Sequence, residues 1–180
     1  SIGSETYDEI RFCGQRIRRQ GKNIVVDQFK EIDELSEIRL AKGLKDSLEC
    51  DSAMHTEYRS VLGSLNWLQS RTQFNIAYRF PRAASAAAKP LIGHVRELNK
   101  LVRTVRAEPV CLTFWPLKGS LRIVGYPDAA FRNNSDKSSQ RGQCIFIAEA
   151  RKLAQGTTDP AFGSLVSYES KKITRTTLST

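Results

Sequence analysis

The residue types that most often bind metals or form nucleophilic sites are few in this chain and far apart. Its cysteines are separated by more than 30 residues and form no C-x-x-C pair, and only two histidines could join them. This spacing argues against a disulfide framework or a zinc ribbon and favours small buried thiols. No nucleophile, base and orienting group support a small stand-alone enzyme. The residues concerned are Cys13, Cys50, Cys111, Cys144, His55 and His94.

Among the carboxylates, Asp128 stands out because it closely follows a run with the pattern of a buried strand, residues 121–126. An aspartate at the end of a strand most often serves in a turn or as a cap. On its position alone, Asp128 therefore predicts no catalysis. A chemical role for it depends on the motifs around it.

A second candidate is the outer face of a helix predicted over residues 55–70. Arg59, Gly63 and Trp67 are spaced four apart and share this face, because each residue of a helix turns it by about 100°. A large aromatic beside a glycine, away from the core, indicates either a flat or grooved partner or a neighbouring helix. The core stripe opposite consists of Tyr58, Val61, Leu62, Leu65 and Leu68.

A second helix is predicted to begin near Pro90, a residue that suits the first turn. Arg96, Lys100 and Arg103 cluster on its outer face. A solvated basic face is the default interpretation, and contact with phosphates is the more specific one. The apolar residues of this helix are Leu91, Val95, Leu98, Val102 and Val105.

The chain carries a formal net charge of +9 over 180 residues, and this charge is unevenly distributed. Residues 1–50 carry 9 basic and 10 acidic side chains, whereas residues 51–180 carry 19 basic and 9 acidic ones, a balance of +10. Each lysine or arginine that meets a phosphate releases counterions, so an acidic polymer is the natural partner. The alternative is that the charge serves solubility alone.

No apolar run approaches the roughly 20 residues that would cross a bilayer, so we expect no membrane partner. Residues 1–10 lack the basic start and apolar stretch of a secretory signal. We therefore expect an intracellular protein in a reducing compartment, with cytoplasm and nucleus both open.

Before the two helices, the pattern predicts a β-hairpin over residues 10–26 with Gly21 in its turn. Asp27 occupies the position of an N-cap. The stretch 41–53 has no convincing period and is predicted to be a loop, and residues 83–89 a connection or a frayed helical end. A short helix is predicted after Asp27, because apolar residues recur at helical spacing: Phe29, Ile32, Leu35 and Ile38.

After the helices the signals change to short strands, predicted over residues 110–114, 121–126, 143–148 and 165–168. The last three follow one another without an intervening helical pattern. This order indicates an antiparallel meander, and the whole chain is predicted to be α+β.

Several short motifs follow one another over nearly the whole chain. Phe12-Cys13-Gly14 resembles the hairpin of copia-type retrotransposon polyproteins that leads from the polymerase palm toward the thumb and grips the primer, and the motifs that follow it resemble that family in order and in spacing. Glu57-Tyr58-Arg59-Ser60-Val61-Leu62-Gly63-Ser64-Leu65-Asn66-Trp67-Leu68, Asn75-Ile76-Ala77-Tyr78 and His94 resemble the segment after the palm. The start of the ribonuclease H domain is similar to Gly125-Tyr126-Pro127-Asp128-Ala129-Ala130-Phe131, Gly142-Gln143-Cys144-Ile145-Phe146, Ser170-Lys171-Lys172 and Leu178-Ser179.

The resemblance implies two parts: a reverse transcriptase thumb and connection over residues 1–116, and the first three antiparallel strands of an incomplete ribonuclease H-like domain over residues 117–180. Polymerases of this family hold two Mg²⁺ ions on paired aspartates, usually in a Y-x-D-D motif. No such motif occurs, and Tyr7-Asp8-Glu9 does not replace it. We therefore expect that this chain alone does not polymerise DNA.

Ribonuclease H domains cut the RNA strand of a hybrid with four carboxylates that bind two metal ions. Asp128 matches the first of them, so the resemblance makes Asp128 a catalytic and Mg²⁺-binding candidate. The other three would lie beyond Thr180, and Asp136, Asp159 and Glu169 match no motif position. One carboxylate cannot hold two hydrated Mg²⁺ ions, so Mg²⁺ is expected in the complete parent domain and only weakly, or not at all, in this chain.

In the resembled thumb, a helix lies along the minor groove of the primer–template duplex, and the matching residues are Arg59, Gly63 and Trp67. A glycine lets the backbone approach the sugars, Trp67 offers a flat surface, and Arg59 or Arg71 can reach phosphate. The expected partners are thus an RNA–DNA hybrid or primer–template duplex and the remainder of the polyprotein. The alternative is a non-catalytic basic module, derived from a transposon, that binds nucleic acid or another protein.

Overall fold

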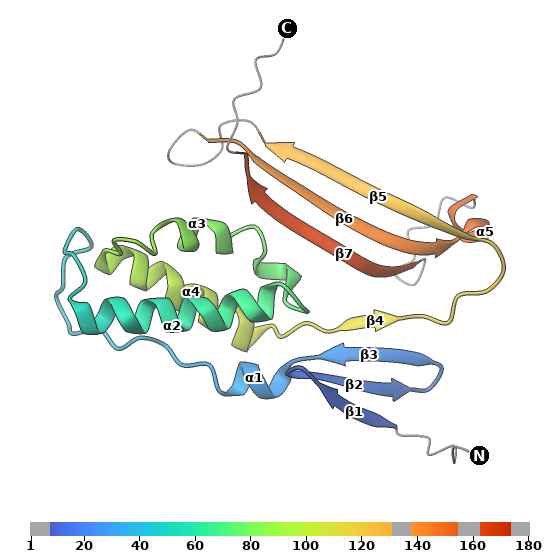
Figure 1. Cartoon of the computed structure of the whole chain (residues 1–180), viewed down its shortest axis with the longest axis horizontal. Coiled ribbons are helices and arrows are strands. Elements are labelled where there is room, and N and C mark those ends of the chain that lie inside the picture. Colours follow the sequence, from blue (N-terminus) through green and yellow to red (C-terminus); the bar gives the residue numbers. More distant parts are fainter. Residues whose placement is uncertain (1–7, 131–137, 155–162, 174–180) are drawn as a thin grey trace, which may run out of the picture.

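The computed structural model describes residues 8–130, 138–154 and 163–173. Two antiparallel sheets and a layer of helices make up this part of the chain, which is the α+β composition that we expected (Figure 1). Five residues and one motif singled out above lie outside the described residues: Tyr7, Phe131, Asp136, Asp159, Thr180 and Leu178-Ser179.

The first sheet has the order β1-β2-β3-β4, and its strands are β1 (Glu9–Phe12), β2 (Gln15–Gln20), β3 (Asn23–Asp27) and β4 (Leu112–Phe114). The predicted turn at Gly21 is confirmed, with φ of +62°. A second turn, at Cys13 and Gly14, falls within the Phe12-Cys13-Gly14 motif and divides the first arm of the hairpin predicted over residues 10–26 into β1 and β2. Both of its residues have positive φ, 48° and 67°, as tight hairpin turns require.

The predicted helix after Asp27 is shorter than expected, because α1 spans only Phe29–Asp33. Asp27 is not its N-cap, although its carboxylate accepts a hydrogen bond from the Phe29 amide at 3.3 Å. That buried carboxylate also binds Arg16 at 2.9 Å, and this hydrogen bond raises the pKa of the guanidinium. Ile38 is buried outside any helix, since its amide and carbonyl are both bonded to the Asn99 side chain at 2.9 Å.

The helical layer consists of α2 (Ser52–Gln69), the short 3₁₀ helix η1 (Phe74–Ile76), α3 (Phe80–Ser85) and α4 (Ile92–Ala107). Helix α2 begins a few residues earlier than predicted because the Asp51 carboxylate caps it, accepting from the Met54 amide at 2.8 Å. Residues 83–89 contain the end of α3 and the turns after it.

The predicted apolar stripes pack in the core, except that Leu91 is the N-cap residue of α4 and lies outside the core cluster, so the helical periodicity is confirmed. The core also holds a polar contact, because the buried Tyr58 hydroxyl donates to the Ala83 carbonyl at 2.8 Å and ties α2 to α3. The buried residues of the predicted stripes are Tyr58, Leu62, Leu65 and Leu68 of α2 and Val95, Leu98, Val102 and Val105 of α4; Leu101 of α4, which was not predicted, joins the same core.

The second sheet is the predicted meander, with the order β5-β6-β7 and antiparallel pairing throughout. Its strands are longer than predicted, namely β5 (Leu121–Ala130), β6 (Gln140–Glu149) and β7 (Gly163–Lys172), and α5 (Ala150–Ala154) follows β6. The boundary placed near residue 116 falls between β4 and β5. It stays a prediction.

Tyr168 of β7 joins this sheet to the helices. Its hydroxyl donates to the Gln69 carbonyl at 2.5 Å, and its ring meets Phe74 edge-on at 5.8 Å between centroids. Gln140 of β6 adds a hydrogen bond to the Tyr78 carbonyl at 3.2 Å. These contacts place β6 and β7 beside the end of α2 and the segment after it (Figure 1).

None of the helices described here has both the length and the apolar character that crossing a membrane requires.

Candidate nucleic-acid interface

The outward face of α2 is polar, is built of small side chains and bears one positive charge. Arg59 and Gly63 lie at its centre and are both exposed. The buried stripe faces the other way and fixes the orientation of this face. No acidic residue belongs to the face, whose exposed members are Ser52, Thr56, Arg59, Gly63, Asn66 and Ser70.

Gly63 lies in the interior of an 18-residue helix, where a glycine costs about 1 kcal/mol relative to alanine. Beyond the neighbouring backbone of its own helix, an ideal Cβ at Gly63 would meet no described atom within 4 Å. No packing contact in the described part of the chain therefore explains the missing side chain. The glycine leaves the helix backbone accessible from outside.

Trp67 lies against the β1–β2 turn. A Cβ placed on Gly14 would be 3.1 Å from the indole Nε1 and 3.4 Å from a Glu31 carboxylate oxygen. The Arg71 guanidinium carbon lies 4.7 Å from the centroid of the same ring, which is the geometry of a cation–π contact. Trp67 is therefore half-buried, and the neighbour that partly covers it is a hairpin turn instead of a helix.

These contacts bring together two motifs that sequence analysis identified separately, the hairpin at residues 12–14 and the helix with Arg59 and Trp67. We call Gly14, Arg59, Gly63, Trp67 and Arg71 the α2–turn surface. Sequence reasoning named all of its residues except Gly14 as site residues. A glycine just after the alternating run that ends at Phe12 was the available signal for the turn.

The three basic residues of α4 that the sequence analysis singled out form a different group, and each has an acidic partner. Arg96 donates to the Leu44 carbonyl at 2.8 Å and pairs with Asp46. Lys100 binds Glu97 at 2.6 Å, and Arg103 pairs with Glu37. These carboxylates offset the positive charge locally, so a phosphate would compete with them for each cation. The phosphate-binding role of Arg96, Lys100 and Arg103 stays a prediction.

Asp128 is exposed on β5, opposite Gly142 of β6. Side chains alternate between the faces of a sheet, and this register places Glu149 and Glu169 on the face opposite Asp128. Glu149 accepts from the Lys118 amide at 2.9 Å, and Glu169 pairs with Arg141 at 3.7 Å.

No group of three or more histidine, cysteine or acidic residues in the described ranges could hold a metal ion. A Mg²⁺ ion needs several anionic ligands. Within the described residues, the single carboxylate of Asp128 is therefore not enough to form a Mg²⁺ site, and we derive no catalytic step from it.

The cysteines are free thiols, but the expectation that all are buried is wrong. Cys13 is exposed because it occupies the β1–β2 turn, and Cys50, Cys111 and Cys144 are half-buried. Burial, with a smaller effect of the Asp51 carboxylate, raises the pKa of the Cys50 thiol.

Comparison of the chain with protein-family models, curated proteins and solved structures finds no match in any of the three. The function proposed below therefore rests on the side chains described here and on the sequence resemblance.

Proposed function

We propose that this chain binds the primer–template duplex, or an RNA–DNA hybrid, as the thumb-and-connection segment and first ribonuclease H strands of a copia-type retrotransposon polyprotein. In this proposal the chain holds the duplex and does not itself cut or extend it. Gly63 is the observation that carries the proposal.

Gly63 supports a contact between the α2 backbone and a ligand, because this glycine destabilises the helix and no packing contact within the described chain offsets that loss. A glycine in an exposed helix interior destabilises the helix by about 1 kcal/mol and gives no packing here. A ligand that approaches the α2 backbone closely would explain it. The minor groove of an A-form duplex is wide and shallow and displays sugar hydroxyls, so a helix can lie along it.

The other residues of the α2–turn surface suit the same ligand. Arg59 is exposed and can reach a phosphate, while Arg71 is exposed and held in place by the Trp67 ring. Such contacts with sugars and phosphates carry no base information, as a protein that must hold any sequence requires. The Gly14 turn fixes the indole edge, so Trp67 offers a rigid flank to the bound duplex.

We assign no catalysis to this chain because of the arrangement of the described carboxylates. Two-metal cleavage needs a clamp of several acidic ligands, and Asp128 is the only carboxylate on its face of the described sheet. In the complete polyprotein, Asp128 would contribute one of the ligands. Here it contributes a charge near the end of an outer strand.

The test measures the binding of a fluorescent 16-base-pair RNA–DNA hybrid to the purified chain over a range of salt concentrations. Affinity should fall linearly on a log–log plot, and Arg59→Gln should reduce the slope by about one. The matched control is Arg106→Gln, which removes an exposed arginine from α4.

Equal effects of the two substitutions would show that net charge, and not the α2–turn surface, attracts the hybrid. Equal affinity for the hybrid and for heparin, a sulfated polysaccharide, would also contradict the proposal. That result would favour a basic module without a preference for nucleic acid.

A further inference from the structure

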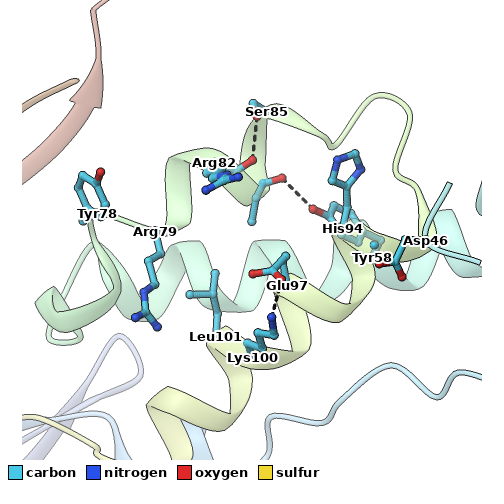
Figure 2. Close-up of a pocket in the computed structure, with 12 residues that line it drawn as sticks. Asp46, Tyr58, Tyr78, Arg79, Arg82, Ser85, His94, Glu97, Lys100 and Leu101 are labelled. Carbon is cyan, nitrogen blue, oxygen red and sulfur yellow. Dashed lines mark hydrogen bonds and ion pairs between the residues drawn. The ribbon is translucent and has the colours of Figure 1, made fainter. Parts of the chain in front are cut away.

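A hollow of about 690 Å³ lies between α3 and α4, on the opposite side of α2 from Gly63. Side chains of α3 and α4 line it, and the buried residues Tyr58 and Leu101 lie at its base (Figure 2). Tyr58 and Gly63 are separated by about 140° around the helix. The hollow is therefore separate from the α2–turn surface.

The acidic residues that line the hollow already have cationic partners. Asp46 pairs with Arg96, and Glu97 binds Lys100 at 2.6 Å. Arg79 and Arg82, by contrast, are exposed and take part in no ion pair within the described ranges. Arg79 is the N-cap residue of α3 and Arg82 lies within the helix, and both line the hollow. Their side chains point in different directions in Figure 2, so a ligand held by both would draw these long, exposed side chains together. The hollow thus carries two positive charges that no carboxylate offsets.

His94 adds a donor whose position is fixed by its own helix. Its Nδ1 accepts a hydrogen bond from the Leu91 amide at 3.0 Å. A neutral imidazole that accepts at Nδ1 must carry its proton at Nε2. His94 therefore offers the hollow an N–H donor even when the ring is uncharged.

The residues at the base of the hollow, Tyr58 and Leu101, offer no free hydrogen-bond donor and no charge to an anion. The Tyr58 hydroxyl uses its proton on the Ala83 carbonyl at 2.8 Å, as the dashed line in Figure 2 marks. Leu101 is 4% exposed and apolar. At the far end lies Tyr78, whose side chain is 56% exposed, and flat aromatic rings of this kind stack with nucleobases.

We propose that this hollow binds the phosphate group of a nucleotide, with Arg79 and Arg82 as the charged partners and His94 as a neutral donor. Guanidinium groups bind phosphate oxygens through paired hydrogen bonds. The volume lies within the range of about 300 to 1,000 Å³ that small ligands occupy in proteins. The phosphate belongs either to a free nucleotide or to a single strand of nucleic acid, since the chemistry of the group is the same in both.

Calorimetry with three probes tests this site: adenosine 5′-monophosphate, a ten-residue oligoadenylate RNA, and adenosine, which has no phosphate. We expect at least one phosphorylated probe to bind and adenosine to bind at least tenfold more weakly. Arg79→Gln combined with Arg82→Gln should weaken that binding at least tenfold. The control removes two exposed arginines outside the hollow, Arg39→Gln with Arg106→Gln, and should change affinity less than twofold.

The outcomes separate the two sources. Binding of the monophosphate but not of the oligonucleotide assigns the hollow to free nucleotides, and the reverse assigns it to a strand. The proposal is overturned if folded wild-type protein binds neither, if adenosine binds equally well, or if the double variant, with an unchanged amide NMR spectrum, binds as wild type does. Gly63→Leu should leave monophosphate binding unchanged, so failure of this site and failure of the duplex proposal are distinguishable.

Discussion

The edge of the Trp67 indole occupies the space that a side chain at position 14 would need. A Cβ on Gly14 would lie 3.1 Å from Nε1 of Trp67, and the φ angle of Gly14 is +67°. The first hairpin and α2 therefore fit together closely because residue 14 is a glycine, for a steric reason as well as a conformational one.

Gly14→Ala should destabilise the protein more than Gly21→Ala. Both glycines have similar positive φ angles, +67° and +62°, so both substitutions carry the same backbone cost of about 1–2 kcal/mol. Apart from its two chain neighbours, Gly21 has no described atom within 4 Å of its ideal Cβ, whereas Gly14 has Trp67. Overpacking adds about 1 kcal/mol or more at position 14. Urea unfolding of the two variants measures the difference.

The same comparison in a Trp67→Phe background isolates the contact. Phenylalanine lacks the Nε1 edge, so the excess cost of Gly14→Ala should disappear there. If Gly14→Ala and Gly21→Ala lower the free energy of unfolding equally in the wild-type background, the indole of Trp67 moves aside without destabilising the protein.

Gly63→Ala should stabilise the free protein and weaken its binding to an RNA–DNA hybrid. Alanine gains up to about 1 kcal/mol in a helix interior, and the space around Gly63 accepts the methyl group. A duplex that touches the backbone at this point would have to move away from it. Thermal unfolding and fluorescence anisotropy measure the two effects, which have opposite signs.

Gly63→Leu should weaken hybrid binding further, and Ser64→Leu is its matched control. Ser64 is exposed on the same helix but about 100° away from Gly63. If both leucine variants bind the hybrid as tightly as the wild type, the duplex does not approach α2 at Gly63.

The sequence predicted those parts of the fold that depend on local periodicity. The stripes of α2 and α4 were recognisable because their apolar residues repeat at helical spacing, and the β5-β6-β7 meander followed from short apolar runs with no helical pattern between them. The five-residue helix α5, between β6 and β7, is too short to give such a pattern. The helix predicted up to Ile38 failed for a non-local reason. Asn99, 61 residues away, offers the Ile38 backbone the hydrogen bonds that a helix would otherwise provide.

The candidate site was predictable to a similar degree. Arg59, Gly63 and Trp67 were found because four-residue spacing places them on one face. The contact of Gly14 with Trp67 depends on how the hairpin folds back onto α2, which no local pattern encodes. Likewise, the ion pair between Arg103 and Glu37 depends on where the segment after α1 runs.

Asn99→Ala should be among the more destabilising substitutions of a polar residue in this chain. It would leave the Ile38 amide and carbonyl buried without partners, at a cost of about 2–4 kcal/mol. Asn75→Ala is the control, because the Asn75 side chain gives a single bond to the exposed Glu108 carbonyl and should cost less than about 1 kcal/mol. If chemical denaturation shows similar losses of unfolding free energy for Asn99→Ala and Asn75→Ala, the Ile38 amide and carbonyl form other hydrogen bonds in the variant.

Tyr58 links stability to pH. Burial raises its pKa to about 12, whereas a tyrosine in an unfolded chain titrates near 10. Below about pH 10 the hydroxyl is protonated in both states, so stability does not depend on it there. Between about pH 10 and 12 the unfolded chain loses this proton and the folded protein keeps it. Stability therefore falls as pH rises, by about 1.4 kcal/mol per unit at most.

Tyr58→Phe should remove this part of the alkaline loss. At neutral pH the variant should be less stable by about 1 kcal/mol, because the Ala83 carbonyl loses its hydrogen bond. Above about pH 10 the difference in unfolding free energy between the two proteins should narrow. Only the wild type loses stability there, because its Tyr58 hydroxyl stays protonated in the folded protein and ionises in the unfolded chain. The pKa of Tyr168 is also raised by burial, but Tyr168 is present in both proteins and cancels in the difference. A constant difference in unfolding free energy from about pH 8 to 12 would show that the Tyr58 hydroxyl ionises as freely in the folded protein as in the unfolded chain.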